Sequence, residues 1–188
     1  MKIVGISGSI VGSKTKIAMD YAINQVREKY PDAEVELIDL GNYDVVYSDG
    51  RNYLDYEGDT KYVTAAIMAA DALIIGTPTF QASIPGTLKN IFDLLPENAF
   101  REKVVSIVVT AGSSKHYLMV EQQLKPILAY MKATVVQTYV FIEEKDFYRK
   151  EIVNDDVHFR LNRLVDDTVQ MIDVMKLIQK AKDDAYNF

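Results

Sequence analysis

Five short apolar runs rich in β-branched residues alternate along the chain with longer segments of helical periodicity. The apolar runs are 3–6, 35–38, 73–75, 104–109 and 135–142, and the helical segments are 15–29, 60–70, 83–95, 115–131 and about 155–185. Because parallel neighbours need a helix-sized connection, this alternation predicts an α/β fold, a doubly wound parallel sheet covered on both faces. Ligands bind such sheets beyond the carboxyl ends of the strands, so the loops after the first, third and fourth strands are the candidate site.

Composition narrows the class of protein. A chain of 188 residues, 48% of them hydrophobic, predicts one domain over residues 1–188. The net charge of -6 makes nucleic acid a poor partner. Cysteine is absent, which removes disulfides, thiol nucleophiles and thiolate metal sites. No apolar run has the length of a membrane span or of a signal peptide's core, so we expect a cytoplasmic location and no membrane contact.

The loop after the first strand, "ISGSIVGSKTKIA", has the features of an anion seat. Ser9, Ser13 and Thr15 supply hydroxyls where the next helix begins, and Lys14 and Lys16 add positive charge. Free N–H groups and the helix dipole favour an anion at such a point. The spacing fits neither a P-loop nor G-x-G-x-x-G. An ordinary helix start, capped by Ser13 or Thr15, stays open as the alternative.

The loop after the third strand begins the stretch "GTPTFQASIPGTLKNIFDLLP" and is unusually elaborate. It combines polar groups, a flat aromatic side chain and two stiffening prolines, at Thr77, Pro78, Thr79, Phe80, Gln81, Ser83 and Pro85. Such a segment suits a planar heteroaromatic ligand at little ordering cost. The alternative is structural: Ser83 caps the following helix and Pro85 lies in its first turn.

The remaining candidate residues and segments indicate a binding or catalytic role less strongly. After the fourth strand, Gly112, Ser113 and Ser114 form a small turn that exposes backbone, and His116 follows in a place more typical of a surface or capping residue. No triad spacing is present, and His116 and His158 lack metal-binding spacing, so we assign no catalytic residue and no metal. Residues 41–61 interleave tyrosines with acids; they form either a surface excursion packed on the sheet edge, or a lid or subunit contact.

Together these loops resemble the NADPH-dependent FMN reductase family of flavodoxin-like proteins, and within it the flavin reductases of sulfonate monooxygenase systems. The matching pieces are "ISGS" with "SKT", "TPTFQASIPGTLKNIFDLLP" and "TAGSSKHYLMVEQQLKPIL". The second follows the family pattern Pro-x-aromatic-x-x-Ser, then Leu-Lys and Asp-Leu-Leu. The pieces extend over residues 1–142, and the resemblance implies a flavodoxin-like three-layer sandwich with a five-stranded parallel sheet in the order 2-1-3-4-5.

The resemblance also implies which residues bind the cofactor. The first loop would hold the FMN phosphate, the second would lie along the isoalloxazine, and the third would flank its other side. These residues are Ser9, Ser13, Lys14 and Thr15; Pro78, Thr79, Phe80, Gln81, Ala82 and Ser83; and Gly112, Ser113, Ser114 and His116. Many members have proline and arginine where this chain has Ile10 and Val11, so the phosphate charge would come from Lys14 or Lys16.

The implied activity is that of an NAD(P)H-dependent FMN reductase. A nicotinamide passes hydride to N5 of FMN, and the electrons go on to free flavin, a quinone or another acceptor. NADPH is the expected donor, with NADH as an alternative, and family habit implies a homodimer or homotetramer and a partner monooxygenase. Three rivals stay open: an electron carrier without nicotinamide chemistry, a quinone or azo reductase with tightly held FMN, and a non-catalytic regulator.

Overall fold

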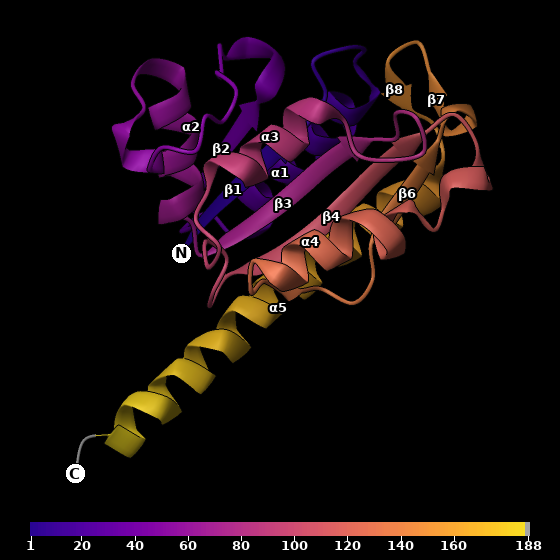
Figure 1. Cartoon of the computed structure of the whole chain (residues 1–188). Helices are drawn as coiled ribbons and strands as arrows, with labels where there is room; N and C mark the ends of the chain where they lie inside the picture. Colours follow the sequence, from indigo (N-terminus) through magenta and orange to yellow (C-terminus); the bar gives the residue numbers. More distant parts are fainter. Residues whose placement is uncertain (187–188) are drawn as a thin grey trace.

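A computed structural model describes residues 1–186 and shows a parallel sheet between two layers of helices (Figure 1). The strands are β1 Lys2–Ser7, β2 Glu34–Asp39, β3 Ala72–Pro78, β4 Val104–Ala111, β5 Thr134–Val135 and β6 Val140–Glu143. Their order is β2-β1-β3-β4-β5, with β6 also paired to β4, and every pair in this sheet is parallel. The flavodoxin-like strand order is therefore confirmed.

The fifth position of the sheet differs from the single strand predicted over residues 135–142. Thr134 pairs with Val104, whereas Val140 pairs with Val108, so two extra residues separate β5 from β6. Polar, exposed Gln137 and Thr138 lie in this interruption. Because side chains alternate with a period of two, an insertion of two residues leaves the same face of the strand toward the core.

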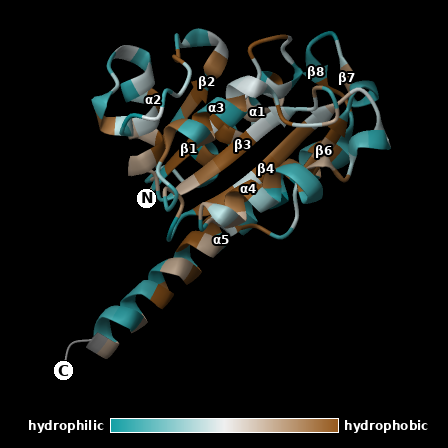
Figure 2. Ribbon diagram, viewed as in Figure 1, coloured by the Kyte–Doolittle hydropathy of each residue, from teal (hydrophilic) through white to brown (hydrophobic). Residues whose placement is uncertain are grey.

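Two apolar cores lie on opposite faces of the sheet. On one face α2 Gly58–Ala69, α3 Gly86–Leu94 and α4 Lys125–Tyr130 cover the sheet, and on the other α1 Lys14–Lys29 and α5 Asp155–Tyr186 do so. Strands β3 and β4 are buried along their whole length, which is why they read as continuous apolar runs (Figure 2). The last residues of both strands lie at the candidate site.

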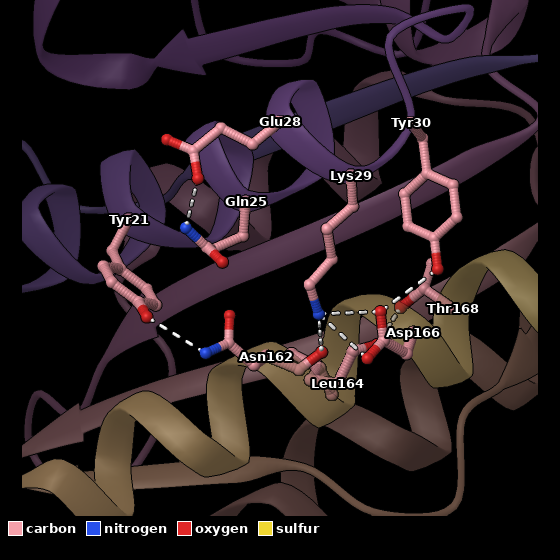
Figure 3. A network of polar contacts seen from close by, with 9 residues as sticks. All are labelled: Tyr21, Gln25, Glu28, Lys29, Tyr30, Asn162, Leu164, Asp166 and Thr168. Carbon is pink, nitrogen blue, oxygen red and sulfur yellow. Dashed lines mark hydrogen bonds and ion pairs between the residues drawn. The ribbon is translucent and has the colours of Figure 1, made fainter.

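Polar contacts fasten α1 to α5 (Figure 3). The Lys29 ammonium lies 2.8 and 2.9 Å from the two carboxylate oxygens of Asp166, and the Tyr30 hydroxyl donates to the same carboxylate at 3.1 Å. Burial, and then the bond to Asp166, raise the pKa of Tyr30. Further along, the Asn162 side-chain amide donates to the Tyr21 hydroxyl at 3.1 Å. These bonds hold α1 in place, and with it the helix N-terminus that lines the candidate site.

The helix predicted over residues 115–131 is broken into three parts. A 3-10 turn covers Ser114–His116, a π-helix covers Val120–Leu124, and only then does α4 begin at Lys125. Pro126 explains the widened turn, because it has no N–H to donate to the carbonyl four residues earlier. The helix predicted over 83–95 is also shorter, since α3 begins at Gly86.

Residues 41–61 pack more closely than their composition indicates. Tyr56 is buried, and its hydroxyl donates to Asp49 Oδ1 at 2.9 Å. The Ser48 N–H donates to Asn90 Oδ1 at 2.9 Å, which ties the segment to α3. Tyr47, by contrast, is 77% exposed. A surface excursion with some of its tyrosines packed inward therefore describes the segment.

Two features complete the fold. After β6, a short hairpin of β7 Phe147–Tyr148 and β8 Glu151–Ile152 stands at the carboxyl edge of the sheet (Figure 1). Across residues 1–186, no helix has both the length and the hydrophobicity that crossing a bilayer requires.

Candidate functional site

A cavity of about 340 Å³ opens at the carboxyl edge of the sheet, above β1, β3 and β4. Its walls come from the three loops singled out in the sequence and from the residue after β6: Val11, Gly12, Ser13, Lys14, Thr15, Pro78, Thr79, Phe80, Thr110, Ala111, Gly112 and Glu144. We call residues 11–15 with Glu144 the first-loop end of the cavity. Residues 78–80 with Gly112 line the other end, which we call the turn end because residues 80–83 form a turn behind it.

The first-loop end begins where β1 meets β3. The Gly8 N–H donates to the Gly76 carbonyl at 2.8 Å, and the Ser9 hydroxyl donates to the Val11 carbonyl at 2.6 Å. Ser13 occupies the N-cap position of α1, but its side chain makes no capping bond with the described residues. The alternative of a helix start capped by the Ser13 side chain is therefore wrong. The first N–H groups of α1 stay available to an anion in the cavity.

The charged groups at this end are already paired. The Lys14 ammonium lies 2.5 Å from Glu144 Oε1, and the bond to Lys14 lowers the pKa of the Glu144 carboxyl. Both side chains are exposed, Lys14 by 42% and Glu144 by 66%. Lys16, the other predicted source of positive charge, does not line the cavity and pairs with Asp20 at 2.6 Å. Lys14 is thus the cation at this end.

A bond between two hydroxyls joins the floor of the cavity to α1. Thr15 Oγ1 lies 2.7 Å from Thr110 Oγ1, and both residues are buried. One comes from the first turn of α1 and the other from β4, so the bond sets the distance between the first loop and the third. The floor is therefore a fixed surface.

The turn end is a tight reversal of the chain. The Phe80 N–H donates to the Ser83 carbonyl at 2.9 Å and the Ser83 N–H donates back at 3.0 Å, with Gln81 and Ala82 between them at φ of 49° and 61°. Left-handed φ at both central residues is typical of a type I′ turn, which glycine and asparagine usually supply. Non-glycine residues in this region are strained, and such strain clusters at ligand sites.

This turn contradicts the structural alternative proposed for the second loop. Ser83 belongs to the reversal and does not cap α3, whose N-cap position is Pro85. Its hydroxyl lies instead 3.4 Å from Gln123 Oε1. The Thr79 N–H donates to the Thr110 carbonyl at 2.9 Å, which carries the pairing of β3 and β4 into the turn.

Two observations at the turn end fit a polar planar ligand. Thr79 Oγ1 is buried in the cavity wall and finds no hydrogen-bond partner within residues 1–186. A Cβ built on Gly112, another lining residue, would meet no atom within 4 Å. A buried hydroxyl without a partner is costly, and a ligand with a polar edge would satisfy it. Phe80, 40% exposed, adds a flat apolar face.

The structure brings half of the predicted site residues into the cavity wall: Ser13, Lys14, Thr15, Pro78, Thr79, Phe80 and Gly112. Ser9, Gln81, Ala82, Ser83, Ser113, Ser114 and His116 lie outside it. Ser9 shapes the first loop, and Gln81 with Ala82 forms the tip of the turn. His116 is half-buried in the 3-10 turn Ser114–His116, whose other two residues are exposed, and it does not line the cavity.

Sequence reasoning missed Val11, Gly12, Thr110, Ala111 and Glu144 as lining residues. Thr110 and Ala111 are the last residues of β4, where the rule on strand ends would have included them. Glu144 follows β6 directly, so the same rule applied to the fifth strand would have found it.

Comparison with known proteins decides the family. A family described as NADPH-dependent FMN reductase matches residues 1–147. The chain belongs to this family. The NAD(P)H-dependent FAD/FMN reductase of Geobacillus thermodenitrificans is 40% identical to this chain, over 91% of this chain and 93% of the relative. The FMN reductase (NADPH) of Escherichia coli is 30% identical, over 86% of this chain and 85% of the relative. The predicted family and its class, the oxidoreductases, are confirmed.

A solved structure agrees with this assignment. The apo form of an NADH:FMN oxidoreductase, EMOB, superposes with a TM-score of 0.73 at 30% identity, covering 89% of this chain and 87% of its own. The match with the family extends across all three loops and ends just beyond Glu144. Every residue that lines the cavity therefore lies within the matched part of the chain.

Proposed function

We propose that the cavity binds FMN and that the protein reduces it with NADPH or NADH. The observation that carries this proposal is the turn end: Thr79, whose buried hydroxyl has no hydrogen-bond partner in residues 1–186, lines the cavity together with Gly112, beside which there is open space. A flavin ring has a polar edge for the hydroxyl and a flat face for the gap. The first-loop end would hold the phosphate, on the first N–H groups of α1 and on Lys14.

Each part of the chain has a separate task in this proposal. Bound FMN supplies the N5 atom that accepts hydride from a nicotinamide. Residues 78–83 orient the ring through fixed backbone, and Thr110 with Thr15 keeps the floor in place. Backbone N–H groups near Gly112 stabilise negative charge on the ring. No side chain needs to move a proton at N5, so we assign none as catalytic.

The hydride donor and the electron acceptor rest on fewer observations than the flavin does. The relatives differ in their names between NAD(P)H, NADPH and NADH, so we propose that either nicotinamide serves. The acceptor we propose is free flavin. The first-loop end is exposed and its cation is already paired, so the phosphate would be held weakly and the flavin could exchange. We place the reaction in the cytoplasm, within a single domain of residues 1–188.

We also propose that the protein is a homodimer and that α5 contributes to the contact. The C-terminal part of α5 extends away from the sheet (Figure 1), and from Asp173 to Ala185 every side chain is exposed or half-buried. Met171, Val174, Ile178, Ala181 and Ala185 recur at the three-and-four spacing of a helix seam. Ile178→Asp should lower the mass seen in sedimentation, whereas Lys180→Asp, outside the seam, should not.

An anaerobic titration tests the proposed function. FMN is added to the purified protein without air, followed by NADPH or NADH, and the visible absorbance of the flavin is followed. Catalytic bleaching of FMN in excess over protein supports the proposal. If FMN binds but neither nicotinamide bleaches it, the protein is an electron carrier, and if FMN does not bind, the cavity has another ligand.

A further inference from the structure

The first-loop end contains an anion where the proposed ligand carries its own negative charge. Among the described residues that line the cavity, the charged ones are Lys14 and Glu144. The Lys14 ammonium lies 2.5 Å from Glu144 Oε1, so the pair carries no net charge. A phosphate monoester brings about -1.5 to -2 charges at neutral pH. It would meet a cation that is already neutralised and a carboxylate that repels it.

Glu144 is ionised at the neutral pH at which the phosphate would bind. Its bond to Lys14 lowers the pKa of its carboxyl, so the group carries its full charge at neutral pH. Its two sequence neighbours do not offset that charge, because Lys145 is paired with Glu143 at 2.8 Å. The first turn of α1 holds no acidic residue. Glu144 is therefore the anion at this end of the cavity.

Glu144 also lies where it competes for Lys14. The carboxylate comes from the segment after β6 and the ammonium from the first residue of α1, so the pair bridges two elements that are 130 positions apart in the sequence. A phosphate on the N–H groups of α1 would lie beside Lys14 and take Glu144's place as its partner. Binding then requires the pair to open, and the released carboxylate stays near the bound phosphate.

We infer that Glu144 sets the affinity for the phosphate of FMN, holding it low enough for the flavin to exchange. The carboxylate competes with the phosphate for Lys14 and repels it, and it leaves the flavin ring unaffected. This inference rests on the proposed function. It extends that proposal by naming a residue that tunes discrimination between phosphorylated and unphosphorylated flavins.

The test compares FMN with riboflavin, which has the same ring and no phosphate. Both are titrated by fluorescence quenching into the wild-type protein and into Glu144→Gln, at about 20 and about 200 mM salt. We expect Glu144→Gln to bind FMN about three- to tenfold more tightly at low salt, with riboflavin changed less than about twofold. The gain for FMN should shrink at high salt. Glu144→Ala repeats the test without the amide.

A matched control removes the effect of overall charge. Glu151 is exposed on β8 and does not line the cavity, so Glu151→Gln changes the net charge equally and should leave both affinities unchanged. The inference is overturned if Glu144→Gln leaves FMN affinity unchanged, if riboflavin gains as much as FMN, or if Glu151→Gln has the same effect. Failure of the wild-type protein to bind either flavin would instead overturn the proposed function, and this inference with it.

Discussion

At the turn end of the cavity the chain is held by backbone hydrogen bonds, whereas at the first-loop end the charged groups are exposed side chains that pair with each other. The turn end continues the buried strands β3 and β4 and closes with paired bonds between Phe80 and Ser83. The first-loop end depends on a salt bridge between Lys14 and Glu144, and exposed pairs of this kind contribute little. The rigid end is therefore suited to orientation and the charged end to adjustable affinity.

This difference explains how one cavity can both orient a flavin and release it. Hydride transfer needs the ring in a fixed position, which preorganised backbone supplies without an ordering cost. Exchange needs a phosphate that is not held too tightly. The account therefore predicts large effects from changes at the turn end, moderate effects at the first-loop end, and small effects from the conformation of the turn tip.

The largest effect is expected from filling the space beside Gly112. Gly112→Val adds a branched side chain to a residue that lines the cavity, and an added Cβ there meets no atom within 4 Å, so the protein should fold normally. We expect FMN and riboflavin to bind at least about 100-fold more weakly, because the side chain takes the space of the ring. Gly112→Ala should weaken both less. Unchanged binding in the valine variant would show that the ring lies elsewhere.

A moderate effect is expected from removing the cation at the first-loop end. Lys14→Ala should weaken FMN binding about tenfold, because the phosphate loses its ion pair and then faces Glu144 alone. Riboflavin should be nearly unaffected. The control is Lys16→Ala, since Lys16 pairs with Asp20 outside the cavity.

The double variant Lys14→Ala/Glu144→Gln sharpens the same comparison. It should recover part of the affinity that Lys14→Ala loses, because the repulsion is removed together with the attraction. Isothermal titration with FMN measures all three variants. Equal affinity of Lys14→Ala and wild type would overturn the assignment of the phosphate to this end.

The smallest effect is expected at the tip of the turn. Ala82 has φ of 61°, which costs an L-residue about 1–2 kcal/mol, so Ala82→Gly should raise the free energy of unfolding by about 0.5 kcal/mol after the added entropy of the unfolded chain. Ala65→Gly, at an exposed position inside α2, should instead lower it by about 1 kcal/mol. Chemical denaturation measures both. Loss of stability in both variants would contradict the left-handed turn.

Much of the fold could be predicted because it depends on hydrophobic patterns that extend over many residues. The buried runs that become β3 and β4, and the helical periods between strands, indicate a parallel sheet whichever turns connect them. The break between β5 and β6 could not be predicted, because a two-residue insertion keeps the alternation of the strand. The π-helix before Pro126 likewise depends on one missing N–H inside an otherwise regular helical pattern.

The candidate site was predictable in its loops but not in its details. Gln81 and Ala82 do not have the usual composition of a left-handed turn, so the sequence did not predict the turn and left a helix cap at Ser83 open as an alternative. Glu144 is 130 positions from Lys14, and only the closed sheet brings the two together. Contacts between distant loops are set by the tertiary fold, which local patterns do not specify.

The most direct test of the account is the affinity of the wild-type protein for FMN and riboflavin, measured side by side at low salt. If the turn end supplies most of the binding and Glu144 offsets Lys14, the two dissociation constants should agree within about tenfold. Binding of FMN more than about 1,000-fold tighter than riboflavin would contradict this account, because the first-loop end would then dominate.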